Sequence, residues 1–368
     1  MPKNANLHGA KKAKNDEFYT QYSDIEREMN AYIEFNPDVF RGKTILLPCD
    51  DPEWSNFTKY FAQNFETLGL KKLISTSYAA NSKPSEIPYQ LTLFETASPK
   101  YDEKKTRTRG KIFTLTRDVN NDKKINIDDL EFDYLEGDGD FRSAEIRKLR
   151  DEADIIITNP PFSLFTEFWP WVIESGKQFA FIVNKNSVTN KDVFPYIMDN
   201  KVWSGREEWG GGMWFETVNK EDVDRYVDGK MMKNVPSIWV TNIDHGRRHQ
   251  PLPLMSLQDN IKYSRHKEVK NIGYKEYVNY DAIEVPYTDS IPSDYDGLMG
   301  VPISFLDKFC PEQFEILGES LILAKPIKEY IESDAVYSKG GPAFYTKISD
   351  KHYKRIYDRI VIKHKEPK

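Results

Sequence analysis

The chain has 368 residues, of which 39% are hydrophobic and 30% are charged, and its formal net charge is −6 at pH 7. This length suits one large domain or two of ordinary size, and the polar composition indicates a soluble globular protein. The acidic balance argues against a non-specific binder of polyanions, but it does not exclude nucleic acid, because local basic clusters matter more than the sum. The basic side chains gather in four segments, residues 104–111, 142–150, 245–249 and 351–368.

Cysteine use and hydropathy indicate the compartment. The cysteines are Cys49 and Cys310, which are far apart and lack the spacing of a metal site. This pattern suits a reducing cytosol and no disulfide framework. Residues 1–14 are polar and basic, unlike a signal peptide, and no apolar run approaches the roughly 18 residues of a membrane span. We therefore expect a cytoplasmic protein.

Apolar runs that alternate with helical segments predict the elements. A polar arm at residues 1–15 and a short helix at residues 24–34 precede this alternation, which continues to about residue 241. It predicts an α/β, doubly wound fold with a mostly parallel, seven-stranded sheet. The expected strands are 43–48, 72–77, 132–135, 154–158, 178–183, 201–203 and 237–241, and the expected helices between them are 56–68, 144–152 and 164–175.

Two regions interrupt this pattern. Residues 80–130 are polar and too long for an ordinary connection, so we interpret them as an insertion with a hairpin near residues 111–116. After Asp244 the alternation gives way to segments rich in proline and tyrosine without a clear period. We therefore predict a first domain at residues 1–245 and a second region at residues 246–368.

The segment Asn159-Pro160-Pro161-Phe162 carries the clearest chemical signal. It directly follows residues 154–158, an apolar β-branched run that predicts a buried parallel strand. Open α/β sheets bind their ligands beyond the carboxyl ends of such strands. The segment is therefore our candidate catalytic loop.

Such a loop suits a planar amine. An amine conjugated to a ring is a poor nucleophile, because its lone pair is delocalised. Two acceptors for its two N–H groups free the lone pair and stabilise the positive charge that develops as the nitrogen attacks an electrophile. Asn159 offers a side-chain carbonyl and Pro160 a backbone carbonyl, the prolines stiffen the loop, and Phe162 offers a ring for stacking. The alternative is a plain turn at the end of a strand, because Asn-Pro pairs often start turns.

The motif resembles the catalytic motif of S-adenosylmethionine-dependent amino-methyltransferases. Residues 16–20, Asp-Glu-Phe-Tyr-Thr, resemble a cofactor-contacting motif that some adenine methyltransferases carry ahead of the first strand. Residues 137–143 fall where that family places an acidic residue at the end of the third strand. Further segments look like parts of the EcoRI-type adenine-specific DNA methyltransferases, namely residues 212–215, 300–303 and 305–308.

The resemblance covers most of the chain and implies a methyltransferase-like sheet, a C-terminal target-recognition region and S-adenosylmethionine as the cofactor. The turn at residues 48–57 has no glycine, although most such enzymes carry a glycine-rich turn there; EcoRI-type enzymes share this departure. Each expected cofactor contact has a purely structural alternative. The aspartates of this turn could cap a helix, Asp140 could belong to an ordinary turn, and Phe18 and Tyr19 could pack in the core. The expected cofactor-binding residues are Phe18, Tyr19, Thr20, Pro48, Asp50, Asp51, Asp140 and Phe141.

The resulting hypothesis is methylation of the exocyclic amine of adenine at a specific sequence of double-stranded DNA. The target base must flip out of the helix, and we expect it to stack on Phe162. Trp214 and Phe215 are candidates for the opposite wall, unless they are buried core aromatics. A restriction endonuclease that acts on the same site would be the partner in a restriction-modification system, without necessarily binding the chain.

Three other interpretations remain open. The same loop geometry would serve a methyltransferase for a guanine amine in RNA or for a glutamine side chain of a protein. The glycine-free turn would also fit a non-enzymatic nucleic-acid-binding protein on a decayed methyltransferase fold. Residues 118–129 place oxygen ligands as a calcium loop does, but Lys123 stands where the sharp turn needs glycine, so we expect a polar turn and no metal site.

Overall fold

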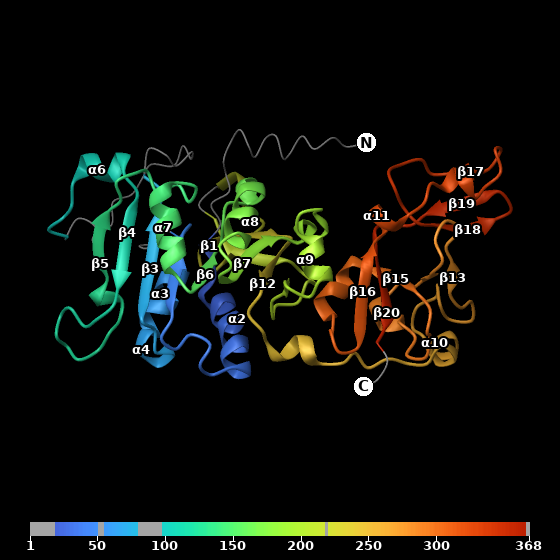
Figure 1. Cartoon of the computed structure of the whole chain (residues 1–368), viewed down its shortest axis with the longest axis horizontal. Coiled ribbons are helices and arrows are strands. Elements are labelled where there is room, and N and C mark those ends of the chain that lie inside the picture. Colours follow the sequence, from blue (N-terminus) through green and yellow to red (C-terminus); the bar gives the residue numbers. More distant parts are fainter. Residues whose placement is uncertain (1–18, 51–54, 80–97, 218–219, 366–368) are drawn as a thin grey trace. The chain divides into compact units, whose positions relative to one another are not determined.

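The computed structural model describes residues 19–50, 55–79, 98–217 and 220–365. The chain divides into two compact units (Figure 1). None of the described helices is long and apolar enough to cross a membrane. The first unit consists of Met1–Ser187 and Trp203–His245, and the second of Val188–Val202 and Gly246–Lys368.

A mixed sheet of eight strands forms the centre of the first unit, in the order β5-β4-β3-β2-β6-β7-β12-β8. The four strands β3, β2, β6 and β7 are paired in parallel, whereas the outer neighbours on both sides are antiparallel. In sequence order the strands are β2 (Thr44–Leu47), β3 (Lys72–Ser77), β4 (Lys111–Leu115), β5 (Glu131–Tyr134), β6 (Ile155–Thr158), β7 (Gln178–Asn184), β8 (Trp203–Ser204) and β12 (Ser237–Thr241).

The α/β class is confirmed, but the prediction of seven mostly parallel strands is wrong in detail. Strand β4 comes from the predicted insertion and lies between β3 and β5, antiparallel to both. Strand β4 fits within the sheet because its side chains alternate between buried and half-buried positions, with Phe113 and Leu115 in the core. Six of the eight strands still run in one direction, since only β4 and β12 run opposite to the rest.

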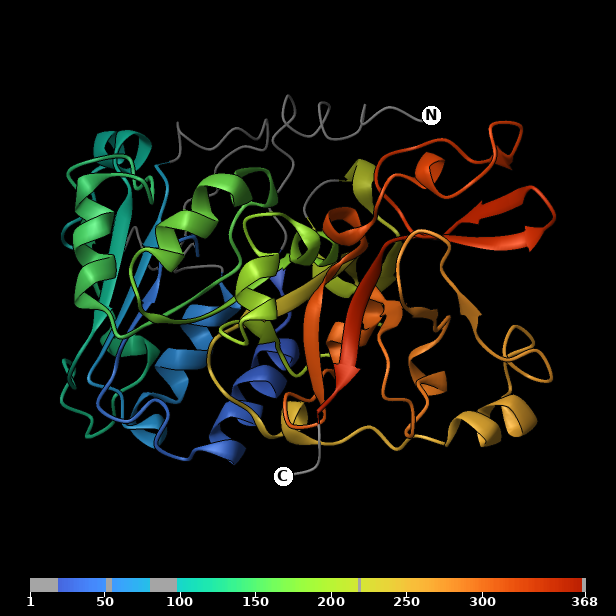
Figure 2. The ribbon, with the colours of Figure 1, turned by 45° about the vertical axis from the view of Figure 1, so that its right-hand side comes forward.

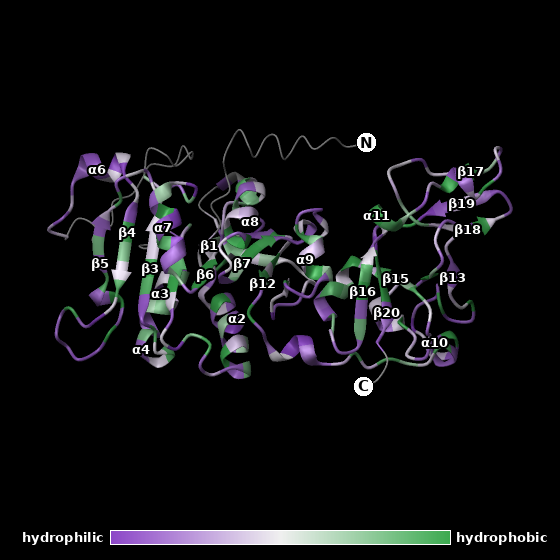
Figure 3. Ribbon diagram, in the orientation of Figure 1, coloured by the Kyte–Doolittle hydropathy of each residue, from purple (hydrophilic) through white to green (hydrophobic). Residues whose placement is uncertain are grey.

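Helices cover both faces of this sheet, as a doubly wound fold requires. On one face, α2, α3 and α4 pack on inward side chains such as Ile45 and Ile155. On the other face, Phe168 of α8 packs edge-to-face on Phe181 of β7, with ring centroids 5.3 Å apart. Strands β7 and β12 are accordingly hydrophobic (green in Figure 3). The helices of the first unit are α2 (Tyr22–Phe35), α3 (Asn56–Gln63), α4 (Phe65–Leu68), α6 (Glu103–Thr108), α7 (Ala144–Glu152) and α8 (Phe165–Ile173).

A second, smaller sheet of the first unit was not predicted. It has four strands in the order β1-β9-β11-β10, all antiparallel. Its first strand comes from the N-terminal region and pairs with the segment that contains Trp214. Its strands are β1 (Tyr19–Thr20), β9 (Met213–Glu216), β10 (Arg225–Val227) and β11 (Lys230–Val235).

The second unit contains a five-stranded and a three-stranded sheet, in the orders β13-β14-β15-β20-β16 and β17-β19-β18. It includes residues 188–202, which the sequence-based division placed in the first domain. Figure 2 shows these short strands from a second side. Its elements are α9 (Phe194–Met198), α10 (Leu257–Tyr263), β13 (Lys275–Glu276), β14 (Ile283–Glu284), β15 (Met299–Pro302), β16 (Phe314–Glu319), α11 (Ser320–Leu323), β17 (Val336–Tyr337), β18 (Tyr345–Ser349), β19 (His352–Arg355) and β20 (Arg359–His364).

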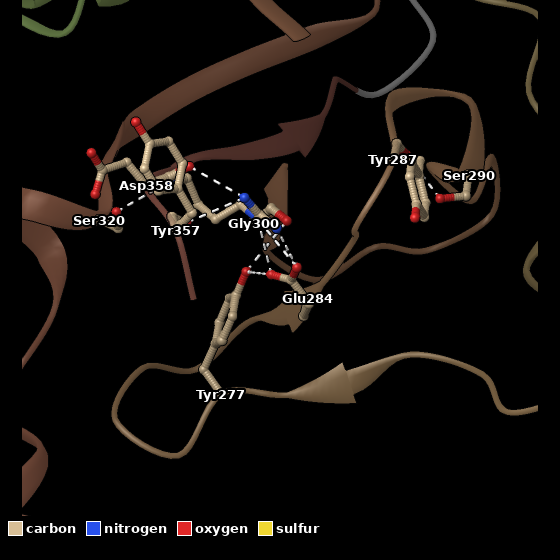
Figure 4. A network of polar contacts seen from close by, with 9 residues as sticks. Tyr277, Glu284, Tyr287, Ser290, Gly300, Ser320, Tyr357 and Asp358 are labelled. Carbon is tan, nitrogen blue, oxygen red and sulfur yellow. Dashed lines mark hydrogen bonds and ion pairs between the residues drawn. The ribbon is translucent and has the colours of Figure 1, made fainter. Parts of the chain in front are cut away.

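A polar network fixes the start of β20 within the second unit (Figure 4). The guanidinium of Arg359 forms a forked ion pair with Glu284, with Nη2 2.6 Å from Oε1 and Nε 3.1 Å from Oε2. Tyr277 donates its hydroxyl to the same carboxylate, and Ser320 accepts the backbone N–H of Arg359 at 3.0 Å. Burial and the Glu284 charge raise the pKa of Tyr277, so its phenol stays protonated. The side chains of this ion pair are only 12% and 10% exposed, so both charges are nearly buried.

Candidate active site

The Asn-Pro-Pro-Phe segment lies at the carboxyl end of β6, between β2 and β7 in the middle of the central sheet. Residues 159–161 have no regular structure, because two successive prolines cannot continue a strand ladder. Phe162 starts a single 3₁₀ turn (η3, Phe162–Leu164) that leads into α8. Asn159 is half-buried, Pro160 is buried, and the half-buried ring of Phe162 packs against the core of the first face. The loop is therefore fixed at its base and partly open at its tip.

Asp50 links this loop to the turn after β2. Its buried carboxylate accepts a hydrogen bond from the hydroxyl of Thr158 at 2.7 Å and another from the hydroxyl of Ser55 at 2.9 Å. Thr158 is the last residue of β6 and directly precedes Asn159, whereas Ser55 caps the N-terminus of α3. The role of Asp50 as a cofactor contact stays a prediction; its side chain joins the end of β6, just before the 159–162 loop, to the start of α3.

Hydroxyl groups at the end of β3 hold the backbone of the same turn. Ser75 donates to the Asp50 carbonyl at 3.2 Å and lies 2.9 Å from the hydroxyl of Thr58. Thr76 donates to the carbonyl of the buried Pro48 at 3.2 Å. The sequence analysis assigned these residues no role. Their hydroxyls instead bond the backbone of a turn that has no glycine.

The loop after β5 brings Asp140 to the end of β3. Gly139 has φ +87°, and a Cβ atom there would lie 2.2 Å from the carbonyl oxygen of Ser77, so only glycine fits. Asp140 forms an ion pair with Arg142, with Nη2 2.5 Å from Oδ2. Partial burial by itself would raise the pKa of Asp140, but the hydrogen bonds and charge of Arg142 outweigh it and lower the pKa. Asp140 is therefore a carboxylate at neutral pH, with 22% of its side chain exposed.

Two residues that the sequence analysis missed, Cys49 and Tyr78, lie beside these carboxylates. Burial and the charge of Asp50 raise the pKa of the Cys49 thiol well above its usual value. Burial, Cys49 and Asp140 likewise raise the pKa of Tyr78. Both groups are neutral at physiological pH, whereas Asp140 and Arg142 beside them are charged. Cys49, Tyr78 and Asp140 are far apart in the sequence. Only the tertiary structure shows that the ends of β2 and β3 and the loop after β5 bring them together.

The N-terminal motif reaches the same end of the sheet through β1. Thr20 pairs with Phe215 in the small sheet, and its carbonyl accepts a hydrogen bond from Asn56 of α3 at 2.8 Å. The hydroxyl of Thr20 is buried and has no hydrogen-bond partner among the described residues. Tyr19 is half-buried and pairs with Glu216. The predicted contacts Phe18 and Asp51 lie outside the described residues.

Two predicted contacts are core residues. Phe141 is fully buried, and its ring lies 5.3 Å from the ring of Phe168. Phe215 is also fully buried, in the core of the first face. Trp214, on the opposite side of β9, is only half-buried, and the guanidinium of Arg225 lies 3.5 Å from the centre of its ring. The alternation of side chains along a strand explains why Trp214 and Phe215 differ.

The polar loop at residues 118–129 uses its carboxylates for its own backbone. Asp129 accepts the backbone N–H groups of Val119, Asn120 and Asn126 at 2.8, 3.2 and 3.0 Å. Asp118 accepts the backbone N–H of Lys123 at 2.8 Å. Among the described residues, no group of three or more His, Cys, Asp or Glu side chains is placed to hold a metal ion.

Comparison with known proteins decides the family. The model of the family described as "Adenine-specific methyltransferase EcoRI" matches residues 6–365. The chain belongs to this family. It is 40% identical to the type II methyltransferase M.EcoRI of Escherichia coli over 317 residues, which cover 84% of this chain and 88% of that protein. The resemblance drawn from the sequence motifs is confirmed.

Two mycoplasma proteins are further relatives of this EcoRI-type chain. The type II methyltransferase M.MpnI of Mycoplasma pneumoniae is 30% identical over 367 residues, 97% of each protein. The type II methyltransferase M.MgeORF184P of Mycoplasma genitalium is 31% identical over 316 residues, 84% of each. No solved structure shows a significant match to the chain. The family match at residues 6–365 includes both units of the EcoRI-type chain.

Proposed function

We propose that the chain transfers a methyl group from S-adenosylmethionine to the exocyclic amine of adenine, at a specific sequence of double-stranded DNA and with base flipping. Family membership supports the reaction and the DNA substrate. The observation that carries the proposal is the position of the loop at residues 159–162, beyond the carboxyl end of β6 and tied to the turn after β2 by the Thr158–Asp50 hydrogen bond. This is the edge of an open α/β sheet where ligands bind.

The loop residues would act on the amine of the flipped base. The side-chain carbonyl of Asn159 and the backbone carbonyl of Pro160 would accept its two N–H groups, which favours a nucleophilic nitrogen and stabilises the charge that develops on it. The half-buried ring of Phe162 offers a stacking surface. For the opposite wall we propose Trp214, whose ring is half-buried and faces Arg225, and not the fully buried Phe215.

The residues at this edge fit S-adenosylmethionine, which would supply an electrophilic methyl group. The buried hydroxyl of Thr20 has no partner among the described residues, as expected of a group that bonds a ligand. The carboxylate of Asp140, which is ionised at neutral pH and 22% exposed, suits a cationic sulfonium compound. We propose that Thr20, Asp140 and the backbone at Pro48 hold the cofactor, while Asp50 positions the turn.

We also propose that the two regions of the chain have different roles. The first domain, residues 1–245, would bind the cofactor and carry out the transfer. The second region, residues 246–368 together with the packed segment 188–202, would recognise the target sequence. A restriction endonuclease that cuts the same sequence would complete a restriction-modification system without needing to bind the chain.

The test is a transfer assay with methyl-labelled S-adenosylmethionine on duplex DNA, RNA and protein, followed by mass spectrometry of the digested products. We expect N6-methyladenine in DNA alone. Asn159→Ala should lower kcat by at least about 100-fold, the usual loss for a transition-state acceptor or donor, with cofactor Kd changed only a few-fold. The control Asn120→Ala, in the β4–β5 loop, should behave as the wild type.

Each other result has a distinct meaning. Transfer to RNA or protein but not to DNA would support the alternative substrates. Normal turnover in Asn159→Ala would refute the mechanism. Absence of cofactor binding in calorimetry would support the non-enzymatic alternative.

A further inference from the structure

The second unit carries a basic segment that the sequence analysis did not single out. It comprises the end of α10 and the turn that follows, residues 262–275, and we call it the basic turn. In a chain with a net charge of −6, this stretch has a formal charge of +4, because Glu268 is its only acidic residue. Its five lysine and arginine side chains are all exposed: Lys262, Arg265, Lys267, Lys270 and Lys275.

The backbone of the basic turn is well fixed. The N–H of Asn271 bonds back to the carbonyl of Ile261 in α10 at 2.8 Å, and the N–H of Lys270 bonds to the carbonyl of His266 at 2.9 Å. Val269 is fully buried and anchors the turn. The return of Asn271 to α10 places Lys270 next to Lys262 along the fold. The turn that carries these lysines therefore folds back onto α10, which is labelled in Figure 1.

An aromatic and acidic contact supports one side of this base. The rings of His266 and Tyr287 stack with centroids 3.6 Å apart and an interplanar angle of 8°. Asp289 bonds both His266, at 2.8 Å, and Arg265, at 2.6 Å. Arg265 is therefore neutralised and has a structural role. The four lysines have no acidic partner among the described residues.

In the basic clusters that the sequence did single out, acidic residues pair with some of the cations. Arg247 pairs with Asp307 at 2.8 Å, and Lys351 pairs with Asp334 at 2.7 Å. An ion pair reduces the charge that a cation presents to a polyanion. Exposed cations also occur in the C-terminal cluster, such as Lys354 and Lys363, but the basic turn adds four exposed lysines within 14 residues that the sequence clusters left out.

We propose that Lys262, Lys267, Lys270 and Lys275 bind phosphates of the DNA substrate. The inference rests on the proposed function, which supplies DNA as the polyanion. Exposed lysines act as point charges toward phosphate, and such contacts position a protein on DNA without reading its sequence. Tyr263 is 58% exposed, and the ammonium of Lys262 lies 4.8 Å from the centre of its ring, so an aromatic side chain is also available beside the phosphates.

The test removes three charges from the full-length chain in the variant Lys262→Gln/Lys267→Gln/Lys270→Gln. Because all three side chains are exposed, the fold should be unaffected. Each lost phosphate contact lowers the slope of log Kd against log [salt] by about 0.9, so we expect a slope smaller by about 2 to 3. At a fixed moderate salt concentration, Kd for a fluorescent duplex that contains the methylation site should rise at least about ten-fold. At saturating DNA, kcat should be unchanged.

The matched control is Lys71→Gln/Lys123→Gln/Lys124→Gln. These lysines are equally exposed and lie before β3 or in the loop between β4 and β5. That is the amino-terminal edge of the parallel strands, opposite the catalytic loop. The control removes the same net charge, so it should weaken binding only slightly. It separates a specific contact from a general effect of charge.

The outcomes distinguish the two proposals. If both triple variants bind DNA with the same affinity and salt dependence, the basic turn is not a DNA contact and the inference is overturned. If the first variant binds DNA normally but loses capture of an acidic protein, the surface serves a different class of partner, and the inference is again wrong. If the wild type binds DNA but never methylates it, the proposed function fails. The Kd values measured with the fluorescent duplex still decide the inference.

Discussion

Replacing Thr158 by valine tests whether the hydrogen bond to Asp50 positions the catalytic loop. Valine keeps the shape of threonine but removes the hydroxyl that lies 2.7 Å from the buried carboxylate. Hydrogen bonds to charged groups contribute about 1.5–3 kcal/mol, and Asp50 would keep the hydroxyl of Ser55. We therefore expect the free energy of unfolding to fall by about 2 kcal/mol. We also expect kcat to fall about 10- to 100-fold, because Asn159 is the next residue and small displacements of reacting groups are costly.

The assay combines urea unfolding with measurement of kcat and of KM for DNA. Thr158→Ser keeps the hydroxyl and should restore kcat to within a few-fold of the wild type. Thr241→Val is the matched control, since Thr241 is fully buried in the same sheet and donates to the carbonyl of Phe179 at 2.7 Å. Its hydroxyl also accepts the backbone N–H of Ile243 at 2.9 Å, so the variant should lose about 2 kcal/mol of stability without losing kcat. The reasoning is refuted if the two valine variants lower kcat equally, or if serine fails to restore it.

Three further predictions concern the fold around the site and the second unit. Gly139→Ala should weaken cofactor binding at least ten-fold in calorimetry, because its Cβ would lie 2.2 Å from a carbonyl oxygen. The control Gly137→Ala has no contact closer than 3.7 Å and should bind the cofactor normally. Equal cofactor affinities of the two variants would contradict this prediction. Burial raises the pKa of Glu28 to about 7, above the 4.5 of the unfolded chain, so its contribution to stability is complete below pH 4.5 and is lost as pH rises through 7. The unfolding free energy of the wild type should thus fall by about 3 kcal/mol more over this range than that of Glu28→Gln, and parallel pH profiles would rule this out. Arg359→Ala should destabilise the second unit by about 3 kcal/mol in urea unfolding, because it leaves a buried carboxylate uncompensated, while loss of the exposed Lys351 should cost under about 1 kcal/mol.

The sequence was most informative where local pattern and burial agree. Residues 154–158 are apolar and β-branched and form the buried strand β6, at the centre of the sheet. The prolines after them cannot extend a strand, so the place of the loop followed from the sequence as well. The family followed from the same short segments, and the family match confirms it.

Sequence patterns were less informative where a residue's role depends on distant neighbours. Asp50 was predicted to contact the cofactor, but its carboxylate is bonded to Thr158, which lies 108 positions away. Trp214 and Phe215 are adjacent and both aromatic, and only the pairing of β9 shows that one is core and the other half-buried. The insertion looked like an addition outside the sheet, whereas β4 lies within it.

The sequence by itself therefore determined the class of fold, the position of the 159–162 loop and the family. These depend on hydrophobic periodicity and on residues that are contiguous in the chain. The tertiary structure alone decided how the loop is held, which aromatics are accessible and which basic residues keep their charge unpaired. Hydrogen bonds, side-chain burial and ion pairs join residues that are far apart in sequence, so no local pattern contains them.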